Sequence, residues 1–179
     1  MKRAFVLAFA LLCTAGGWAQ DRVEGLSADF SLGQWKDSMV FGAGIQSPLL
    51  FGSAAFRAQA FLVLTPRLDG IEETMDAYPA ARVGLAGYSG VTDGGCRLYG
   101  AGGLLVAMPS AKLSDATWVF GGWGCFGFEF FTGEADASGG FCYYIELGTN
   151  SSGAKTDKLP AHEFLLNGFA CQAGVRWYP

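Results

Sequence analysis

The only histidine of this chain, His162, lies in a polar stretch near the carboxyl terminus. Hydroxyl and carboxyl side chains share that stretch: Ser151, Ser152, Asp157 and Glu163. A serine activated by a histidine that an acid orients performs acyl transfer or hydrolysis, here with lipid as a substrate class. Nothing in the spacing fixes such a geometry, so we favour a solvated loop and expect no enzyme. One histidine, in a chain whose cysteines fall inside strands, shows no metal-ligand spacing, so we also expect no metal and no cofactor.

Charged residues that alternate with apolar ones along short segments are the second set of candidates. They are Asp29, Arg57, Arg82, Arg97, Glu129, Glu146 and Arg176. All of them fall on the side opposite the apolar residues, and four arginines nearly balance three acids. Arg97 with Glu129, and Asp29 with Arg176, fall at similar heights on neighbouring segments. Because buried charges need partners, these residues predict either a structural network or the lining of a narrow polar path.

Eight strands are required to position these charges. Turn-like clusters divide the chain into alternating segments, which predict strands at about 25–35, 38–46, 51–64, 78–89, 96–108, 117–131, 139–148 and 166–178. Successive side chains of a strand point to opposite faces, so each segment has one apolar and one polar or small face. Most segments have the roughly 9 to 11 residues that a tilted strand needs to cross a bilayer.

The composition decides which face points outward. Charged residues make up only 16% of the chain, against about 25% in an average soluble domain. An eight-stranded barrel has an interior just wide enough for its own side chains, and the many Phe and Leu residues would crowd it. We therefore predict an all-β fold, an eight-stranded antiparallel transmembrane β-barrel with short periplasmic turns and its apolar face in lipid.

The first 19 residues have the features of a secretory signal. Lys2 and Arg3 precede an apolar run, and the run ends near Ala19 in a small-x-small pattern. We expect export, a single barrel domain at 20–179 and a location in the bacterial outer membrane. With both barrel ends in the periplasm, the second and fourth outer loops fall at 65–77 and 148–163.

Aromatic residues near strand ends predict interfacial girdles: Trp35, Phe51, Tyr78, Trp118, Phe130 and Trp177.

Four cysteines follow the signal, and all of them fall inside predicted strands: Cys96, Cys125, Cys142 and Cys171. We favour their role as small apolar residues, with Cys125 and Cys142 as the one pair to consider for a disulfide.

The tripeptide Gly33-Gln34-Trp35 is similar to the Gly-x-Trp of lipocalins, which implies a soluble binder of apolar ligands as an alternative.

The chain resembles the small eight-stranded outer-membrane barrels, the OmpA membrane domain, OmpX and OmpW, over its whole length after the signal. The ending GVRWYP is similar to the aromatic last strand that the barrel-assembly machinery recognises, although Pro179 follows the aromatic residues. The resemblance implies outer-membrane lipid and that machinery as partners. We expect a non-enzymatic membrane anchor or surface-contact protein, with small solutes or host ligands at loops two and four.

Two other functions remain open within this class. One is an OmpW-like, porin-like narrow channel for small solutes, including hydrophobic ones. The other is a lipid-modifying outer-membrane enzyme. The net charge of −4, without a basic patch, predicts no nucleic-acid partner.

Overall fold

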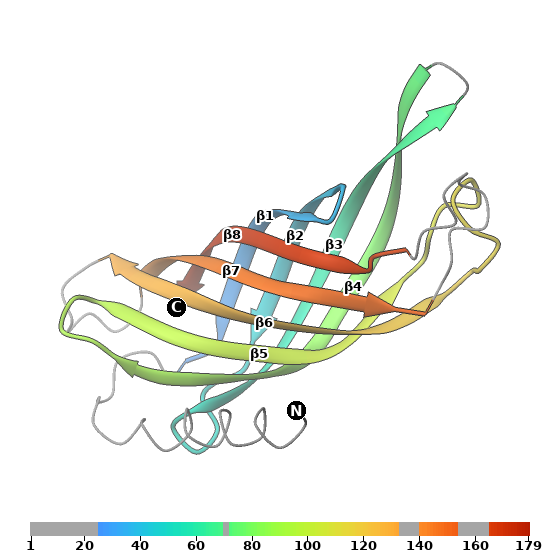
Figure 1. Ribbon diagram of the computed structural model, residues 1–179. Coiled ribbons are helices and arrows are strands. Elements are labelled where there is room, and N and C mark those ends of the chain that lie inside the picture. The colour runs from blue at the N-terminus through green and yellow to red at the C-terminus, as the bar shows by residue number, and fades with distance from the viewer. Residues whose placement is uncertain (1–24, 70–71, 133–139, 154–164) are drawn as a thin grey trace.

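Eight antiparallel strands close into a barrel in the computed structural model, which describes residues 25–69, 72–132, 140–153 and 165–179 (Figure 1). The strands are β1 (Ser27–Trp35), β2 (Ser38–Gln46), β3 (Ala54–Asp69), β4 (Glu72–Val91), β5 (Cys96–Ala107), β6 (Val119–Thr132), β7 (Gly140–Ser152) and β8 (Gly168–Tyr178). Each strand pairs with the next, and β8 pairs with β1. The predicted eight-stranded antiparallel barrel is confirmed.

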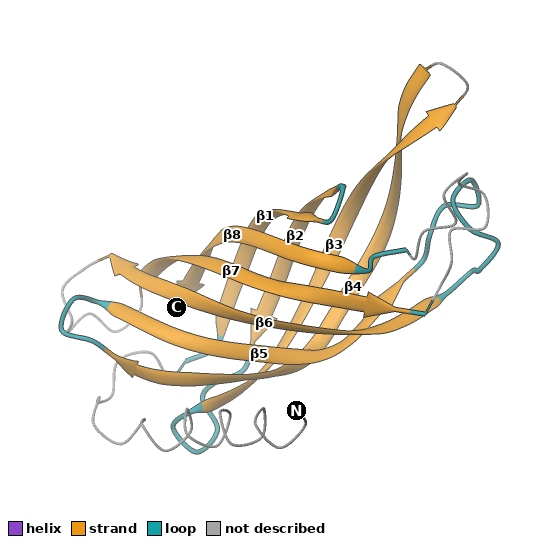
Figure 2. Cartoon of the chain, in the orientation of Figure 1, coloured by secondary structure: helices purple, strands orange, loops and turns teal. Residues whose placement is uncertain are grey.

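Strands account for most of the described chain, with loops and turns at the two ends of the barrel (Figure 2). Among the described residues, no helix is both long enough and apolar enough to cross a membrane. The predicted signal peptide at 1–19 lies outside the described residues. We call the end at which β1 begins and β8 ends the terminal end, and the opposite end the far end.

The alternation of side chains separates a polar interior from an apolar outer surface. In β1, Asp29 and Ser31 are buried, whereas Phe30 and Leu32 are 55% and 50% exposed. Large apolar side chains are exposed in the same way on all the other strands. A surface of this kind is stable in lipid and unfavourable in water, while the hydrogen bonds of a closed barrel satisfy the backbone. The apolar face points outward, as predicted.

Of the six aromatic residues expected in the interfacial girdles, four point outward and two do not. Phe51, Trp118, Phe130 and Trp177 are exposed near strand ends. Trp35 and Tyr78 instead point into the barrel and are only 1% and 2% exposed. The reason is the strand period: Trp35 shares the face of Asp29, and Tyr78 shares the face of Arg82, so neither ring reaches the lipid.

The largest difference from the predicted strands lies at 65–77, which was expected to be an outer loop. The structure instead continues β3 and β4 as a paired ribbon from Thr65–Asp76 to Asp69–Glu72. This extension projects beyond the rest of the barrel at the far end (Figure 1). Within it, Arg67 Nε donates to Asp76 Oδ2 at 2.9 Å. β7 likewise extends to Ser152, beyond its predicted end at 148.

Proline and glycine explain why this segment resembles a loop in the sequence. Pro66 lies in β3 beyond its last partner in β2, since that ladder ends at Met39–Leu64. Proline cannot donate to a ladder, so strands accept it where an edge is free. At the base of the extension, the hydroxyl oxygens of Ser38 and Thr65 lie 2.7 Å apart and join the ribbon to the barrel wall.

Removing the extension should leave the barrel intact. We expect a variant in which Asn-Gly replaces residues 66–75, between the paired residues Thr65 and Asp76, to unfold within about 0.5 kcal/mol of the natural chain, as for surface changes. The measurement is urea unfolding in lipid vesicles, followed by heat-modified gel mobility. Loss of the fast-migrating folded band would contradict this and make the extension part of the folded core.

Candidate functional site

All seven charged residues singled out from the sequence project into the lumen. They come from seven of the eight strands and are at most 6% exposed: Asp29, Arg57, Arg82, Arg97, Glu129, Glu146 and Arg176. Successive side chains of a strand alternate between its two faces, and each of these charges falls on the inward face. Six of the seven take part in ion pairs with one another, and Arg82 does not.

Glu129 is the centre of the cluster at the terminal end. Arg97 is its direct partner in the β5–β6 register, and Arg97 Nε donates to Glu129 Oε2 at 2.8 Å. Arg176 donates to the other carboxylate oxygen, and the Tyr178 hydroxyl lies 3.3 Å from it. Arg97 Nη2 also donates to the Tyr178 hydroxyl at 2.8 Å. Two guanidinium groups therefore share one buried carboxylate.

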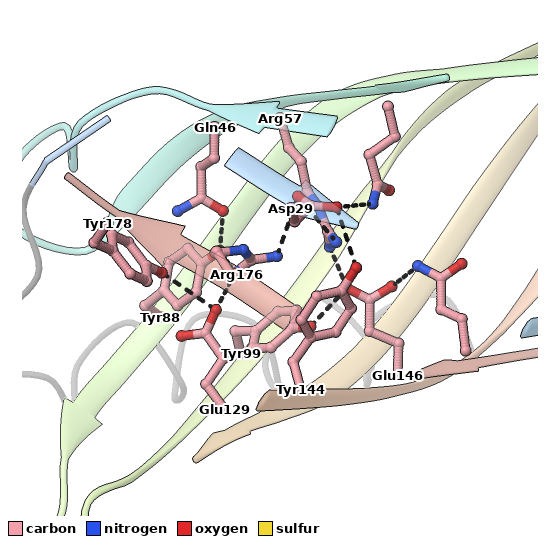
Figure 3. A network of polar contacts seen from close by, with 12 residues as sticks. Asp29, Gln46, Arg57, Tyr88, Tyr99, Glu129, Tyr144, Glu146, Arg176 and Tyr178 are labelled. Carbon is pink, nitrogen blue, oxygen red and sulfur yellow. Dashed lines mark hydrogen bonds and ion pairs between the residues drawn. The ribbon is translucent and has the colours of Figure 1, made fainter. Parts of the chain in front are cut away.

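Arg176 connects this cluster to the middle of the barrel. Asp29 is its partner in the β1–β8 register, and their closest charged atoms, Nη2 and Oδ2, lie 3.7 Å apart. Asp29 also accepts from Gln59 at 2.9 Å and from Tyr144 at 3.1 Å. Figure 3 shows Arg176 between Glu129 and Asp29, so that the contacts continue from one acid to the next.

Glu146 is the acceptor of the middle cluster. It accepts hydrogen bonds from Arg57 and Gln172, and from the Tyr99 hydroxyl at 2.6 Å (Figure 3). Arg57 Nη2 also lies 3.9 Å from Asp29 Oδ2. The pair Arg57–Glu146 joins β3 to β7 across the lumen, so it ties together strands that are not neighbours in the sheet.

Glycines make room for the tyrosines of this network. A Cβ atom added at Gly127 would lie 2.5 Å from Tyr99 Cζ, and one at Gly174 would lie 2.6 Å from Tyr144 Cζ. Such distances are too short for carbon atoms, so each ring occupies space that only a glycine leaves free. The glycine content of the chain thus helps to position the hydroxyl groups that reach Glu146 and Asp29.

Arg82 is the one of the seven lumen charges that lies in the far half of the lumen, among mostly apolar side chains. Arg82 Cζ lies 4.1 Å from the ring centroid of Trp35 and 5.0 Å from that of Trp123, and its Nη2 donates to Asn150. Around and beyond it lies an apolar cluster, which we call the far plug. Its buried members are Trp35, Val40, Phe61, Val63, Tyr78, Ala80, Leu105, Ala107, Leu113, Val119, Trp123, Leu165, Leu166 and Ala170. Leu113, Leu165 and Leu166 reach it from connections between strands.

Within the described residues, the lumen carboxylates are already engaged in contacts that connect the strands. Each of the three lumen carboxylates is already in an ion pair with at least one arginine. A general acid or base must exchange protons with a substrate, which such contacts oppose. In the part of the chain that the structure describes, no group of three or more potential metal ligands occurs. The arrangement is suited to hold strands together.

The loop residues considered for catalysis are only partly described. Ser151 is exposed, whereas Ser152 is buried and donates to the backbone oxygen of Leu165. His162, Asp157 and Glu163 lie outside the described residues. The two serines end β7, so they belong to a strand and not to the loop predicted for them.

Cys125 and Cys142, the one pair considered for a disulfide, do not form one, because the four cysteines of the described part are free, as favoured from the sequence. In the β6–β7 register, Cys125 lies opposite Gly148 and Cys142 lies opposite Phe131. The two cysteines are therefore about 20 Å apart along the strands, at 3.3 Å per residue. A disulfide requires Cα atoms within about 7 Å.

Several side chains that contact the lumen charges were not singled out as candidates from the sequence, although the alternation of the strands places them on the inward face. Tyr88, Tyr99 and Tyr144 share the inward face of their strands with the charges. The Tyr88 hydroxyl donates to Gln46 and lies 3.2 Å from Arg176 Nη1. Asn150 was placed in a loop, so its contact with Arg82 was missed.

Comparison with known proteins bears on the fold alone. No family model matches the chain, and no curated protein matches its sequence. Among solved structures, the N-terminal β-barrel domain of Pseudomonas aeruginosa OprF matches with a TM-score of 0.58 and 11% sequence identity, over 88% of this chain and 98% of that one. Together with the apolar outer surface, this likeness shows that the chain has the fold of the small eight-stranded outer-membrane β-barrels.

Proposed function

We propose that this chain is an integral protein of the bacterial outer membrane and serves as a non-enzymatic anchor that makes contacts at the cell surface. The observation that supports it most is the filled lumen. Linked side chains occupy the terminal end and the middle, and the far plug occupies the rest. A barrel closed along its length is suited to anchoring and offers no open route for solutes. Export by the signal and insertion by the assembly machinery are part of this proposal.

The β3–β4 extension supports the contact role. It carries paired strands beyond the barrel wall, and Met75 in it is 52% exposed. Asp76 lies 3.9 Å from Lys112 of the connection between β5 and β6 and also bonds to Arg67. Because the ribbon is paired and tied at its base, it presents a surface at little entropic cost on binding. Host ligands at this loop and at the connection between β7 and β8 are the expected partners.

A narrow channel is the second candidate, and unpaired polar atoms in the lumen favour it. Arg57 Nε and Nη2, Gln59 Oε1 and Gln172 Oε1 are buried without a hydrogen-bond partner among the described residues. Buried water commonly satisfies such atoms, and a chain of water is the beginning of a polar path. Small apolar solutes could also leave the lumen sideways through a gap between β5 and β6, which are rich in glycine. This route has less support, because the ladder between the two strands runs without a break from Cys96–Phe130 to Ala107–Val119.

Single-channel recording in planar bilayers distinguishes these candidates. For the anchor we expect stable insertion, verified by heat-modified mobility, without discrete openings. Discrete openings whose size changes in Arg57→Gln would contradict the anchor and support the channel. The Asn-Gly variant that lacks residues 66–75 is the matched control, since it changes the outer surface and leaves the lumen residues in place.

A further inference from the structure

The polar atoms around Arg82 are unusual because they are all hydrogen-bond donors. Arg82 Nε, Trp35 Nε1, Trp123 Nε1 and Asn150 Nδ2 are buried and have no partner among the described residues. Each belongs to a residue that contacts the Arg82 guanidinium group or is Arg82 itself. Since an unsatisfied buried donor destabilises a fold, four of them on Arg82 and the residues that contact it point to a missing acceptor.

The middle of the lumen differs in this respect. There, the unpaired donors of Arg57 and Arg176 are accompanied by unpaired acceptors, which are Asp29 Oδ2, Gln59 Oε1 and Gln172 Oε1. Water donates and accepts, so it satisfies such a mixture. Gln59 is the partner of Arg82 in the β3–β4 register, but its amide donates to Asp29, and the residues that contact the Arg82 guanidinium group contain no unpaired acceptor. An acceptor-only ligand is therefore the better match for it.

The balance of charges in the lumen also favours a negatively charged ligand. The lumen holds four arginines and three carboxylates, and every carboxylate is paired with an arginine other than Arg82. Arg82 is only 3% exposed and has no ion pair with an acidic residue of the described part. Ring faces of Trp35 and Trp123 provide some cation–π stabilisation, but no carboxylate of the described part lies within ion-pair distance of the guanidinium group.

We propose that Arg82, Trp35, Trp123 and Asn150 form a binding site for a small monovalent anion such as chloride. The guanidinium group supplies the charge, and the indole and amide N–H groups supply donors. The far plug around the site favours anions that give up their hydration shell easily, so bromide should bind more tightly than chloride. The site is independent of whether the barrel conducts.

A halide-dependent stability measurement tests this site. The purified protein is refolded in micelles in sodium gluconate or sodium bromide at equal ionic strength, and thermal unfolding is followed by heat-modified mobility. Because the anion binds only the folded barrel, we expect the midpoint to rise by roughly 3–6 °C for each tenfold of bromide above its dissociation constant. Arg82→Gln should lose this dependence.

Asn150→Asp is the decisive variant, since it places a carboxylate where Arg82 Nη2 already donates. We expect it to abolish the bromide effect and to raise the midpoint in gluconate. Gln46→Glu is the matched control: it adds a carboxylate at the terminal end of the lumen, where Gln46 accepts from Tyr88, and should keep the bromide effect.

Fluorescence locates the anion. With Trp118→Phe and Trp177→Phe removing two exposed indoles, saturable bromide quenching that disappears in Asn150→Asp would place the anion beside Trp35 and Trp123. Equal midpoints in bromide and gluconate for the natural chain, or a midpoint of Asn150→Asp no higher than that of the natural chain in gluconate, would overturn the proposal.

Discussion

Replacing Glu129 by leucine is expected to lower the free energy of unfolding of the barrel by roughly 3–5 kcal/mol, the usual cost of breaking a buried ion pair from one side. The carboxylate is fully buried and accepts from both Arg97 and Arg176. Its loss leaves two cations without their shared partner at the terminal end, where the low dielectric strengthens their repulsion. The measurement is urea unfolding in lipid vesicles.

Two further variants show whether charge or packing causes this loss. Glu129→Gln keeps the shape of the side chain and removes the charge, so it should lose much of the same stability. The triple variant Arg97→Leu, Glu129→Leu, Arg176→Met removes the charged groups together and should recover most of the loss, because apolar replacements of buried ion pairs are often neutral. If Glu129→Leu unfolds like the natural chain, the lumen charges do not stabilise the barrel, and their role as pore lining gains support.

The placement of these charges was predictable because it depends on a local rule. Period-2 alternation assigns each side chain to a face, and the charges of seven segments all fell on one side. Neighbouring strands then brought Arg97 to Glu129 and Asp29 to Arg176 in direct register. The same rule, applied to Trp35 and Tyr78, would have placed both rings inside. Both residues lie near strand ends, where girdle aromatics are expected, but their side chains point inward, so the girdle prediction is wrong for them.

Contacts across the lumen were not predictable from the sequence. Arg57 meets Glu146 and Arg82 meets Asn150 between strands that are not neighbours. Which residues face each other there depends on the stagger of the strands around the barrel, and a single strand does not contain that information.

The β3–β4 extension was missed for a different reason. Its strands pair only with each other, so proline and polar residues are tolerated and the usual signal of a strand is weak.

An arginine in the middle of the outer surface is expected to show whether that surface lies in lipid. Ile145 is 49% exposed near the middle of β7, and Phe141 is 56% exposed at the beginning of the same strand. If the barrel crosses a membrane, Ile145→Arg should lower the free energy of unfolding in vesicles by about 2–4 kcal/mol, and Phe141→Arg by about 0–1 kcal/mol, because the cost of a cation falls towards the interface.

The two positions form a matched pair, since both side chains are apolar, outward-facing and on one strand. In a soluble lipocalin-like barrel, both substitutions would place an arginine in water and change stability by no more than about 0.5 kcal/mol. Equal and small effects would therefore contradict a transmembrane barrel. A large effect at Ile145 alone follows from the hydrocarbon core, because the substituted groups differ little in exposure and the main difference between them is depth in the bilayer.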